Sequence, residues 1–158
     1  MLNKRSSLKS IGASVQGELK FNTDKANIDS HGESGIGGSL HDAGSKCLIS
    51  FSKSVGITDC TSTEILAIIG TCSLFRKSTW AKDFRLVIET DHKFAADWLE
   101  NPQQCPIIFK SLIEACLKEC NDMEWRVSGV LRECNSLADS LAKKGIEQSH
   151  DMFSLLKF

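Results

Sequence analysis

An almost unbroken apolar run at residues 84–91, FRLVIETD, is the feature that most constrains the fold of this chain. A strand with one solvated face alternates apolar and polar side chains, whereas a run that is apolar on both faces is typical of a central strand covered on both sides. The run therefore predicts an α/β sheet with helices on each face. It ends in an acid, Asp91, which on its own would be interpreted as the N-cap of a following helix.

Four further segments have the composition of strands. Residues 18–24 alternate polar and apolar side chains and end at Asp24. Residues 34–40 are rich in glycine but lack the G-x-G-x-x-G spacing of a dinucleotide-binding loop, so we expect glycines that allow close packing within a strand. A turn then leads to a third strand at 46–52, which completes an antiparallel meander. A last strand is predicted at 123–128.

Helices are predicted between the later strands, where apolar residues recur at helical spacing. The first follows several N-cap candidates at 58–63 and carries Glu64 in its first turn, where a carboxylate also suits the helix dipole. A second is expected at 92–100 and a third from about residue 107. The third helix is expected to bury one face, formed by Ile108, Leu112, Ile113, Cys116 and Leu117.

The closing helix places an acid beside its own apolar stripe. The stripe consists of Leu137, Ala138, Leu141 and Ala142, which repeat at helical spacing. Asp139 lies next to this stripe, and a carboxylate at the edge of a core needs a partner. Gly145 is predicted as the C-cap of the helix.

The composition fits one domain and restricts its partners. With 158 residues, of which 41% are hydrophobic and 25% charged, the chain can bury a core of its own. Its net charge of −1 excludes a nucleic-acid binder that works by bulk attraction, although a local basic face remains open. No apolar run approaches the ~20 residues that span a bilayer, so we expect a soluble protein with no membrane partner.

The ends of the chain and its cysteines give further expectations. Residues 1–17 are expected to be a flexible linker, with a short targeting segment as the alternative, residues 18–146 the domain, and residues 147–158 a tail. Seven cysteines without a Cys-x-x-Cys pair indicate free thiols in a reducing intracellular compartment, whether cytoplasm, nucleus or organelle. Cys116 and Cys120 are interpreted as small core residues, with a metal site as the alternative.

Four isolated acids suggest a metal site when they are considered together: Asp24, Glu64, Asp91 and Asp139. Ends of strands are where α/β folds place their chemistry, so we expect these carboxylates to meet. Carboxylates held close together either raise one another's pKa or bind hard divalent ions such as Mg²⁺. Two such ions roughly 3.5–4 Å apart can promote displacement at phosphorus. The chemistry that follows is phosphodiester hydrolysis.

The chain resembles the ribonuclease H superfamily, and within it the plant-type domain associated with reverse transcriptases of retroelements. The resemblance covers about residues 19–145 and rests on five motifs in the family order: KFNTD at 20–24, GIGG at 35–38, TEILAI at 63–68, IETD at 88–91 and LRECNSLADSLA at 131–142. It implies a five-stranded mixed sheet flanked by helices. It also implies that the four acids hold two Mg²⁺ or Mn²⁺ ions and that the RNA strand of an RNA/DNA hybrid is cut, which leaves 3′-hydroxyl and 5′-phosphate ends.

Several positions depart from the family pattern. Lys25 follows the first acid, where relatives usually have glycine, and it could contact a phosphate, crowd the hybrid or pair with a site acid. Gly129 stands where active bacterial relatives carry a mobile histidine, so we expect low turnover. Thr61 replaces an asparagine that touches the DNA strand. The connection between Trp98 and Phe109 has no room for a basic protrusion, so binding should be weak and salt-sensitive.

Substrate contacts are expected from Lys25, Thr61, Arg132 and Asn135. The leading hypothesis is a monomeric nuclease that acts on RNA/DNA hybrids. The second is a nucleic-acid-binding or protein-interaction domain with the same fold and little catalysis, and the third is a related exonuclease or transposase core. His92, next to Asp91, could approach the site, but an exposed histidine at a helix start is the preferred interpretation.

Overall fold

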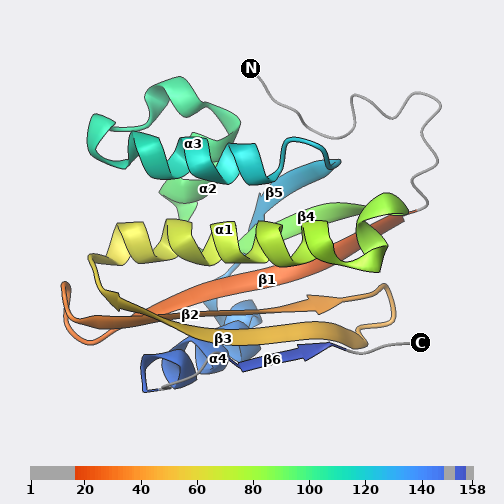
Figure 1. Ribbon diagram of the computed structural model, residues 1–158, viewed down its shortest axis with the longest axis horizontal. Coiled ribbons are helices and arrows are strands. Elements are labelled where there is room, and N and C mark those ends of the chain that lie inside the picture. Colours follow the sequence, from red (N-terminus) through yellow and green to blue (C-terminus); the bar gives the residue numbers. More distant parts are fainter. Residues whose placement is uncertain (1–16, 148–151, 156–158) are drawn as a thin grey trace.

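A single mixed sheet organises the computed structural model, which describes residues 17–147 and 152–155 (Figure 1). The strand order is β5-β4-β1-β2-β3-β6. The strands are β1 (Gly17–Asn27), β2 (Glu33–His41), β3 (Cys47–Ile57), β4 (Phe84–Thr90), β5 (Trp125–Gly129) and β6 (Met152–Leu155). The predicted α/β class is confirmed, and β4, the apolar run, lies inside the sheet between β1 and β5.

The pairing of the strands confirms the predicted meander. β1 pairs antiparallel with β2, and β2 pairs antiparallel with β3. β1 also runs parallel to β4, which in turn runs parallel to β5. The five expected strands are therefore all present in a mixed sheet. The bounds differ from the prediction, because β1 continues past Asp24 to Asn27, β3 continues to Ile57 and β5 begins only at Trp125. A short β6 that was not predicted pairs antiparallel with β3.

Within the described residues, four α-helices connect or cover the strands: α1 (Cys60–Lys77), α2 (Lys93–Glu100), α3 (Lys110–Glu119) and α4 (Ser136–Ile146). The side chain of Asp59 caps α1 by accepting a hydrogen bond of 2.9 Å from the backbone N–H of Ser62. Because α1 begins at Cys60, Glu64 lies in its second turn and not in the first turn as predicted. Its side chain is buried, so it is not a surface carboxylate that merely complements the helix dipole.

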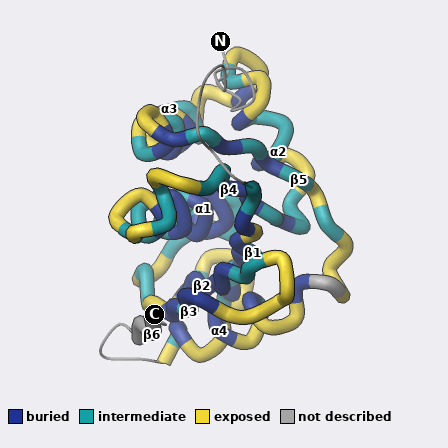
Figure 2. The backbone as a smooth tube through the Cα atoms, turned by 90° about the vertical axis from the view of Figure 1, so that its right-hand side faces the viewer, coloured by how far each residue is buried: buried dark blue, intermediate teal, exposed yellow. Residues whose placement is uncertain are grey.

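The two faces of the sheet are covered by different helices. Figure 2 shows α1 and α3 on one side of the strands and α4 on the other. The core between the sheet and α1 contains fully buried Phe21, Ile68 and Ile88, and Ile113 extends it toward α3. These residues come from the apolar patterns that predicted the elements.

The predicted core face of α3 is wrong at its first position. Ile108 is 74% exposed, because Ile107–Phe109 form a 3-10 turn and α3 begins only at Lys110. Further along the helix, Ile113 and Cys116 are buried. Leu112 and Leu117 pack partly buried against the core, as expected.

Glycines in β2 allow α4 to lie unusually close to the sheet. A Cβ atom added to Gly37 would stand 2.5 Å from the backbone nitrogen of Ala142, and one added to Gly145 would stand 2.6 Å from the carbonyl oxygen of Lys53. Both contacts are shorter than side chains tolerate, so the close packing expected of the β2 glycines is present. Gly145 is not the predicted C-cap, because it lies inside α4 and Glu147 caps the helix.

In the described part of the chain, no helix has the length and apolar character needed to cross a membrane.

Candidate metal centre

Three carboxylates converge at the edge of the sheet where β1 and β4 deliver them. Asp24 lies in β1, Glu64 in α1, and Asp91 follows the last residue of β4. One oxygen from each lies within 4.8 Å of the others. The parallel pairing of β1 with β4 sets Asn22 opposite Glu89, so the two aspartates come at equivalent points along neighbouring strands. The expected meeting of acids is therefore observed for three of the four.

Burial of these acids makes their negative charge costly without a counter-ion. Asp24 is 5% exposed, Glu64 1%, and the side chain of Asp91 8%. Desolvation, with the charges of Asp24 and Asp91, raises the pKa of Glu64 to about 8. Desolvation also raises the pKa of Asp24 to about 6, with smaller contributions from Asp91 and Asp139. Both carboxyls therefore resist ionisation in the absence of a cation.

Two buried oxygens in the cluster have no hydrogen-bond partner among the described residues. They are Oε1 of Glu64 and Oδ2 of Asp91. A buried acceptor without a partner is destabilising, and native proteins seldom keep one without a reason. Carboxylate oxygens are the ligands that Mg²⁺ and Mn²⁺ prefer, so the three carboxylates and the two oxygens without hydrogen bonds fit a divalent cation.

Two basic residues line the rim of this site. The backbone N–H of Lys25 donates a hydrogen bond of 2.8 Å to Oδ1 of Asp24, and the side-chain charge of Lys25 lowers the pKa of Glu64. Nε of Arg132 lies 3.8 Å from Oδ2 of Asp91, while the Arg132 side chain is 82% exposed. Both basic side chains are thus near the acids, and that of Arg132 is largely exposed.

Asp139 lies close to the three acids but outside their group. Its Oδ2 is 3.0 Å from Nζ of Lys143 one turn later in α4, and its side chain is 37% exposed. Its charge still contributes to the raised pKa of Asp24. The position of Asp139 as a fourth ligand remains a prediction.

Asn135 and Thr61, two of the expected substrate contacts, differ in their surroundings. Asn135 is 1% exposed, and its side-chain amide donates a hydrogen bond of 2.8 Å to the carbonyl oxygen of Thr23. It therefore holds the entry to α4 against β1. Thr61 is half-buried in the first turn of α1.

A second polar anchor was not anticipated from the sequence. The side-chain amide of Asn27 donates hydrogen bonds to Oγ1 of Thr63, at 2.9 Å, and to the carbonyl oxygen of Thr58, at 3.2 Å. These contacts fasten the end of β1 to the start of α1, one residue before Glu64. The predicted strand ended at Asp24, and only the continuation of β1 to Asn27 brings this side chain to α1.

His92 and Gly129 flank the site. Nδ1 of His92 accepts a hydrogen bond of 3.0 Å from the N–H of Ala95, so His92 is the N-cap of α2 in place of Asp91. The ring is half-buried, not exposed as expected, and burial lowers its pKa. Gly129 is exposed beside a depression of about 450 Å³ that Asp91 also lines, and a Cβ atom there would meet nothing within 4 Å.

The mixed sheet with helices on both faces, with one acid inside β1 and another directly after β4, defines a ribonuclease H-like domain. The family model described as "Reverse transcriptase-like" matches residues 22–145, and the chain belongs to this family. A search of curated proteins finds no match.

Three solved structures with the same fold are distant from this chain in sequence. RNase H1 from the halophilic archaeon Halobacterium salinarum NRC-1 has a TM-score of 0.74 at 15% identity, covering 83% of this chain and 98% of that one. LC11-RNase H1, isolated from compost by a metagenomic approach and solved with an RNA/DNA hybrid, has a TM-score of 0.73 at 19% identity, covering 82% and 96%. The protease-reverse transcriptase of prototype foamy virus has a TM-score of 0.69 at 18% identity, covering 93% of this chain and 23% of that one.

Proposed function

We propose that this domain is a divalent-metal-dependent endonuclease that cuts the RNA strand of RNA/DNA hybrids. The observation that carries the proposal is the cluster of Asp24, Glu64 and Asp91, whose buried oxygens include two without a hydrogen-bond partner among the described residues. Membership of the family supports it. Further support comes from two structural neighbours that were solved with an RNA/DNA hybrid, LC11-RNase H1 and the foamy viral protease-reverse transcriptase.

The roles of the acids follow from their places in the fold. Asp24, Glu64 and Asp91 would hold the cations, and Asp139, from the opposite side of the sheet edge, would complete the set for a second ion. Two Mg²⁺ or Mn²⁺ ions would supply activation of a water and stabilisation of the leaving oxygen. In the absence of ions the carboxylates repel one another, so they are prepared to bind cations but not to act alone.

The basic rim provides the contacts to the substrate. Lys25 and Arg132 stand beside the acids, and the exposed Arg132 guanidinium, 3.8 Å from Asp91, would meet phosphates of a strand laid across the site, with Lys25 next to it. Such contacts position a nucleic acid without reading its sequence. Thr61, in the first turn of α1, would contact the second strand. Asn135 acts indirectly, since its hydrogen bond to Thr23 fixes the distance between β1 and the helix that carries Asp139.

Low turnover is part of the proposal. β5 ends at Gly129, which has no side chain to exchange protons or assist product release. Lys25 adds a positive charge where the ions would bind, and this competes with them electrostatically. With few cations around the site, hybrid affinity should fall steeply as salt is raised.

A second candidate is a domain that binds nucleic acid or a protein and has lost most catalysis. The same two positions, Lys25 and Gly129, favour it. The two candidates differ in one result, because a binding domain would retain a hybrid in Mg²⁺ without producing fragments.

The proposal is tested with an end-labelled RNA/DNA hybrid in Mg²⁺ and, separately, in Mn²⁺. We expect fragments of the RNA strand with 3′-hydroxyl and 5′-phosphate ends, and none from single-stranded RNA or double-stranded DNA. Asp91→Asn should reduce the rate at least ~100-fold, whereas Asp122→Asn, an exposed acid in the turn before β5, should not. Activity that survives Asp91→Asn would identify a contaminating nuclease and contradict the proposal.

A further inference from the structure

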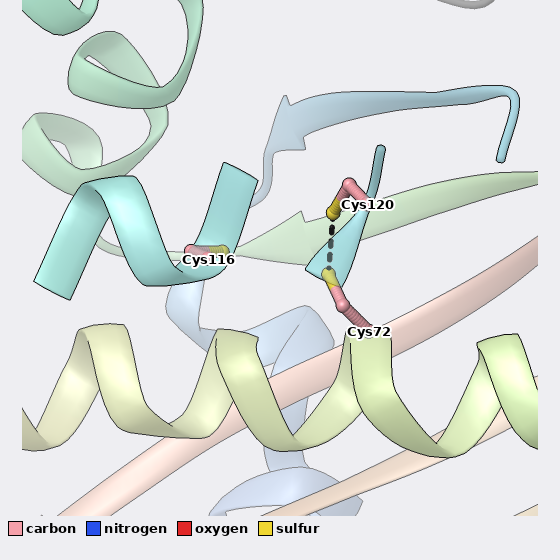
Figure 3. A group of neighbouring side chains, drawn as sticks. All are labelled: Cys72, Cys116 and Cys120. Atoms are coloured by element: carbon pink, nitrogen blue, oxygen red, sulfur yellow. Dashed lines mark hydrogen bonds between the residues drawn. The ribbon is translucent and has the colours of Figure 1, made fainter. Parts of the chain in front are cut away.

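Three cysteine sulfurs meet in the core between α1 and α3, away from the carboxylates. Cys72 lies in α1 and Cys116 in α3, and Cys120 is the C-cap residue that follows α3 (Figure 3). Each is at most 1% exposed, and the three sulfurs lie within 4.8 Å of one another. The proposed nuclease chemistry uses none of them.

Two of the three sulfurs lie in direct contact with one another. Sγ of Cys72 and Sγ of Cys120 are 2.9 Å apart, and Figure 3 shows the two side chains pointing at one another across the gap between the helices. A disulfide requires roughly 2.05 Å, so a movement of less than about 1 Å would join them. The pair is therefore near bonding geometry in the folded protein.

A metal ion fits this place less well than a covalent bond. Structural zinc sites take four ligands, and the described residues offer three sulfurs here with no histidine or carboxylate. Three thiolates would also place a large negative charge in an apolar core, which is costly. A disulfide is neutral and leaves no charge behind, so burial does not oppose it.

We propose that Cys72 and Cys120 form a reversible disulfide when the protein meets a small peroxide, and that this bond fastens α1 to the end of α3. In the first step, the Cys120 thiolate attacks hydrogen peroxide, the O–O bond breaks, and Cys120 sulfenic acid and hydroxide form. In the second, the Cys72 sulfur attacks the Cys120 sulfur and the S–O bond breaks. The departing oxygen leaves as water, so two thiols and one peroxide give one disulfide and two waters.

The surroundings of Cys120 make it the sulfur that reacts first. Hydrogen bonding with the thiols of Cys116 and Cys72 holds the pKa of Cys120 below its ordinary value, and the charge of Arg76 acts in the same direction. The thiolate is the reactive form of cysteine. Cys120 also begins the turn that contains exposed Asn121 and Asp122, so a local opening of this turn admits a small uncharged oxidant.

The bond should stabilise the fold measurably, because it closes a long loop. Cys72 and Cys120 are separated by 48 positions. Cross-links over loops of this length restrict the unfolded chain, and the expected rise in melting temperature is about 10 °C. Thiol reductants should remove the increase.

The experiment treats the folded full chain with hydrogen peroxide, blocks remaining thiols by alkylation, and maps disulfides by mass spectrometry without reduction. We expect a Cys72–Cys120 peptide pair, together with the rise in melting temperature. The pair should persist in Cys116→Ser and in Cys47→Ser, an exposed cysteine, and both effects should vanish in Cys72→Ala. The peptide map of the unmodified chain is decisive even if Cys72→Ala is unstable.

Two results would overturn the proposal. One is that the thiols of Cys72 and Cys120 can still be alkylated after a dose of peroxide that fully oxidises Cys47. The other is stoichiometric binding of added Zn²⁺ that protects all three cysteines from peroxide, which would assign the cluster to a metal. Neither result bears on cleavage of hybrids, since the carboxylate site is separate.

Discussion

The side-chain amide of Asn135 lies 2.8 Å from the carbonyl oxygen of Thr23, to which it donates a buried hydrogen bond. Thr23 immediately precedes Asp24, and Asn135 immediately precedes α4, which carries Asp139. One bond thus connects the first and the last of the four acids through backbone that is 112 positions apart in the chain. The spacing of the candidate metal site depends on it.

Replacing Asn135 with alanine should therefore weaken both the fold and the site. Loss of the bond leaves the Thr23 carbonyl without this partner in the core, at a cost of about 1–3 kcal/mol in the free energy of unfolding. The Mg²⁺ concentration for half-maximal cleavage should also rise, because the start of α4 is less firmly held. Chemical denaturation and a Mg²⁺ titration measure the two effects. Asn121→Ala, in an exposed turn, is the control, and an unchanged Mg²⁺ requirement in Asn135→Ala would contradict the positioning role.

The metal-free protein should lose stability as the pH rises from about 4 to 8. Glu64 and Asp24 have raised pKa values of about 8 and about 6, so the folded state holds protons that the unfolded state has released. Their stabilising contribution is complete below pH ~4 and is lost as the pH passes through 6 and 8, by an amount on the order of a few kcal/mol.

Glu64→Gln isolates this effect, because its side chain cannot ionise. Denaturation at a series of pH values should give a flatter profile for Glu64→Gln than for the unmodified chain. The difference between the two proteins is the readout, since the lowered pKa of His92 contributes a slope of opposite sign in both. Parallel profiles would mean that Glu64 is ionised without cost.

Asp24→Asn should raise the melting temperature in the absence of metal and reduce the response to Mg²⁺. The amide keeps an oxygen to accept the Lys25 N–H but removes one charge from the cluster. For the unmodified chain, Mg²⁺ at 100 times its dissociation constant should add about 2.7 kcal/mol, or roughly 5–10 °C. Thermal melts with and without Mg²⁺ test this. A lower melting temperature with an unchanged Mg²⁺ response would show that Asp24 is a structural residue.

Gly129→His should increase turnover several-fold without loss of stability. A side chain there meets open space, and the position shares a depression with Asp91, so the imidazole can reach the site. Histidine changes its charge near neutral pH and can exchange protons with a leaving group. Steady-state cleavage of a hybrid measures the gain, with Gly129→Ala as the control for added bulk. Equal turnover in both variants would mean that this position does not limit the reaction.

Lys25→Ala should raise the KM for hybrid about tenfold and change kcat little, if Lys25 contacts a phosphate. The slope of log affinity against log salt should become shallower by about one, as expected for one lost phosphate contact. Lys20→Ala, at an exposed position of the same strand, should leave both quantities unchanged. A higher kcat with unaltered KM would instead indicate that Lys25 obstructs the ions.

The convergence of Asp24 and Asp91 could be predicted because it depends on backbone topology. Each follows an apolar or alternating run, and the strands that these runs form are parallel neighbours. Glu64 was predicted to join them although its helical turn was assigned wrongly. The direction in which a helix presents a side chain depends on where the helix begins, and the cap at Asp59 fixes that.

Features that depend on packing between distant segments could not be predicted in this way. Nothing local distinguishes Gly145 as a contact to Lys53 from a glycine that ends a helix. The exposure of Ile108 follows from a 3-10 turn that shifts the phase of the apolar pattern. The ion pair between Lys143 and Asp139 joins residues one helical turn apart, so it can be predicted from the sequence. Whether Lys143 competes with a metal ion for the Asp139 carboxylate depends on how α4 packs against β2, which cannot.

A crystal structure of the protein soaked in Mn²⁺, with anomalous data, tests the central claim most directly. The account predicts two anomalous peaks, each within coordination distance of carboxylate oxygens from Asp24, Glu64, Asp91 and Asp139, with Asp139 released from Lys143. Absence of any peak at these acids, with the Lys25 ammonium lying between them in the place of an ion, would contradict it.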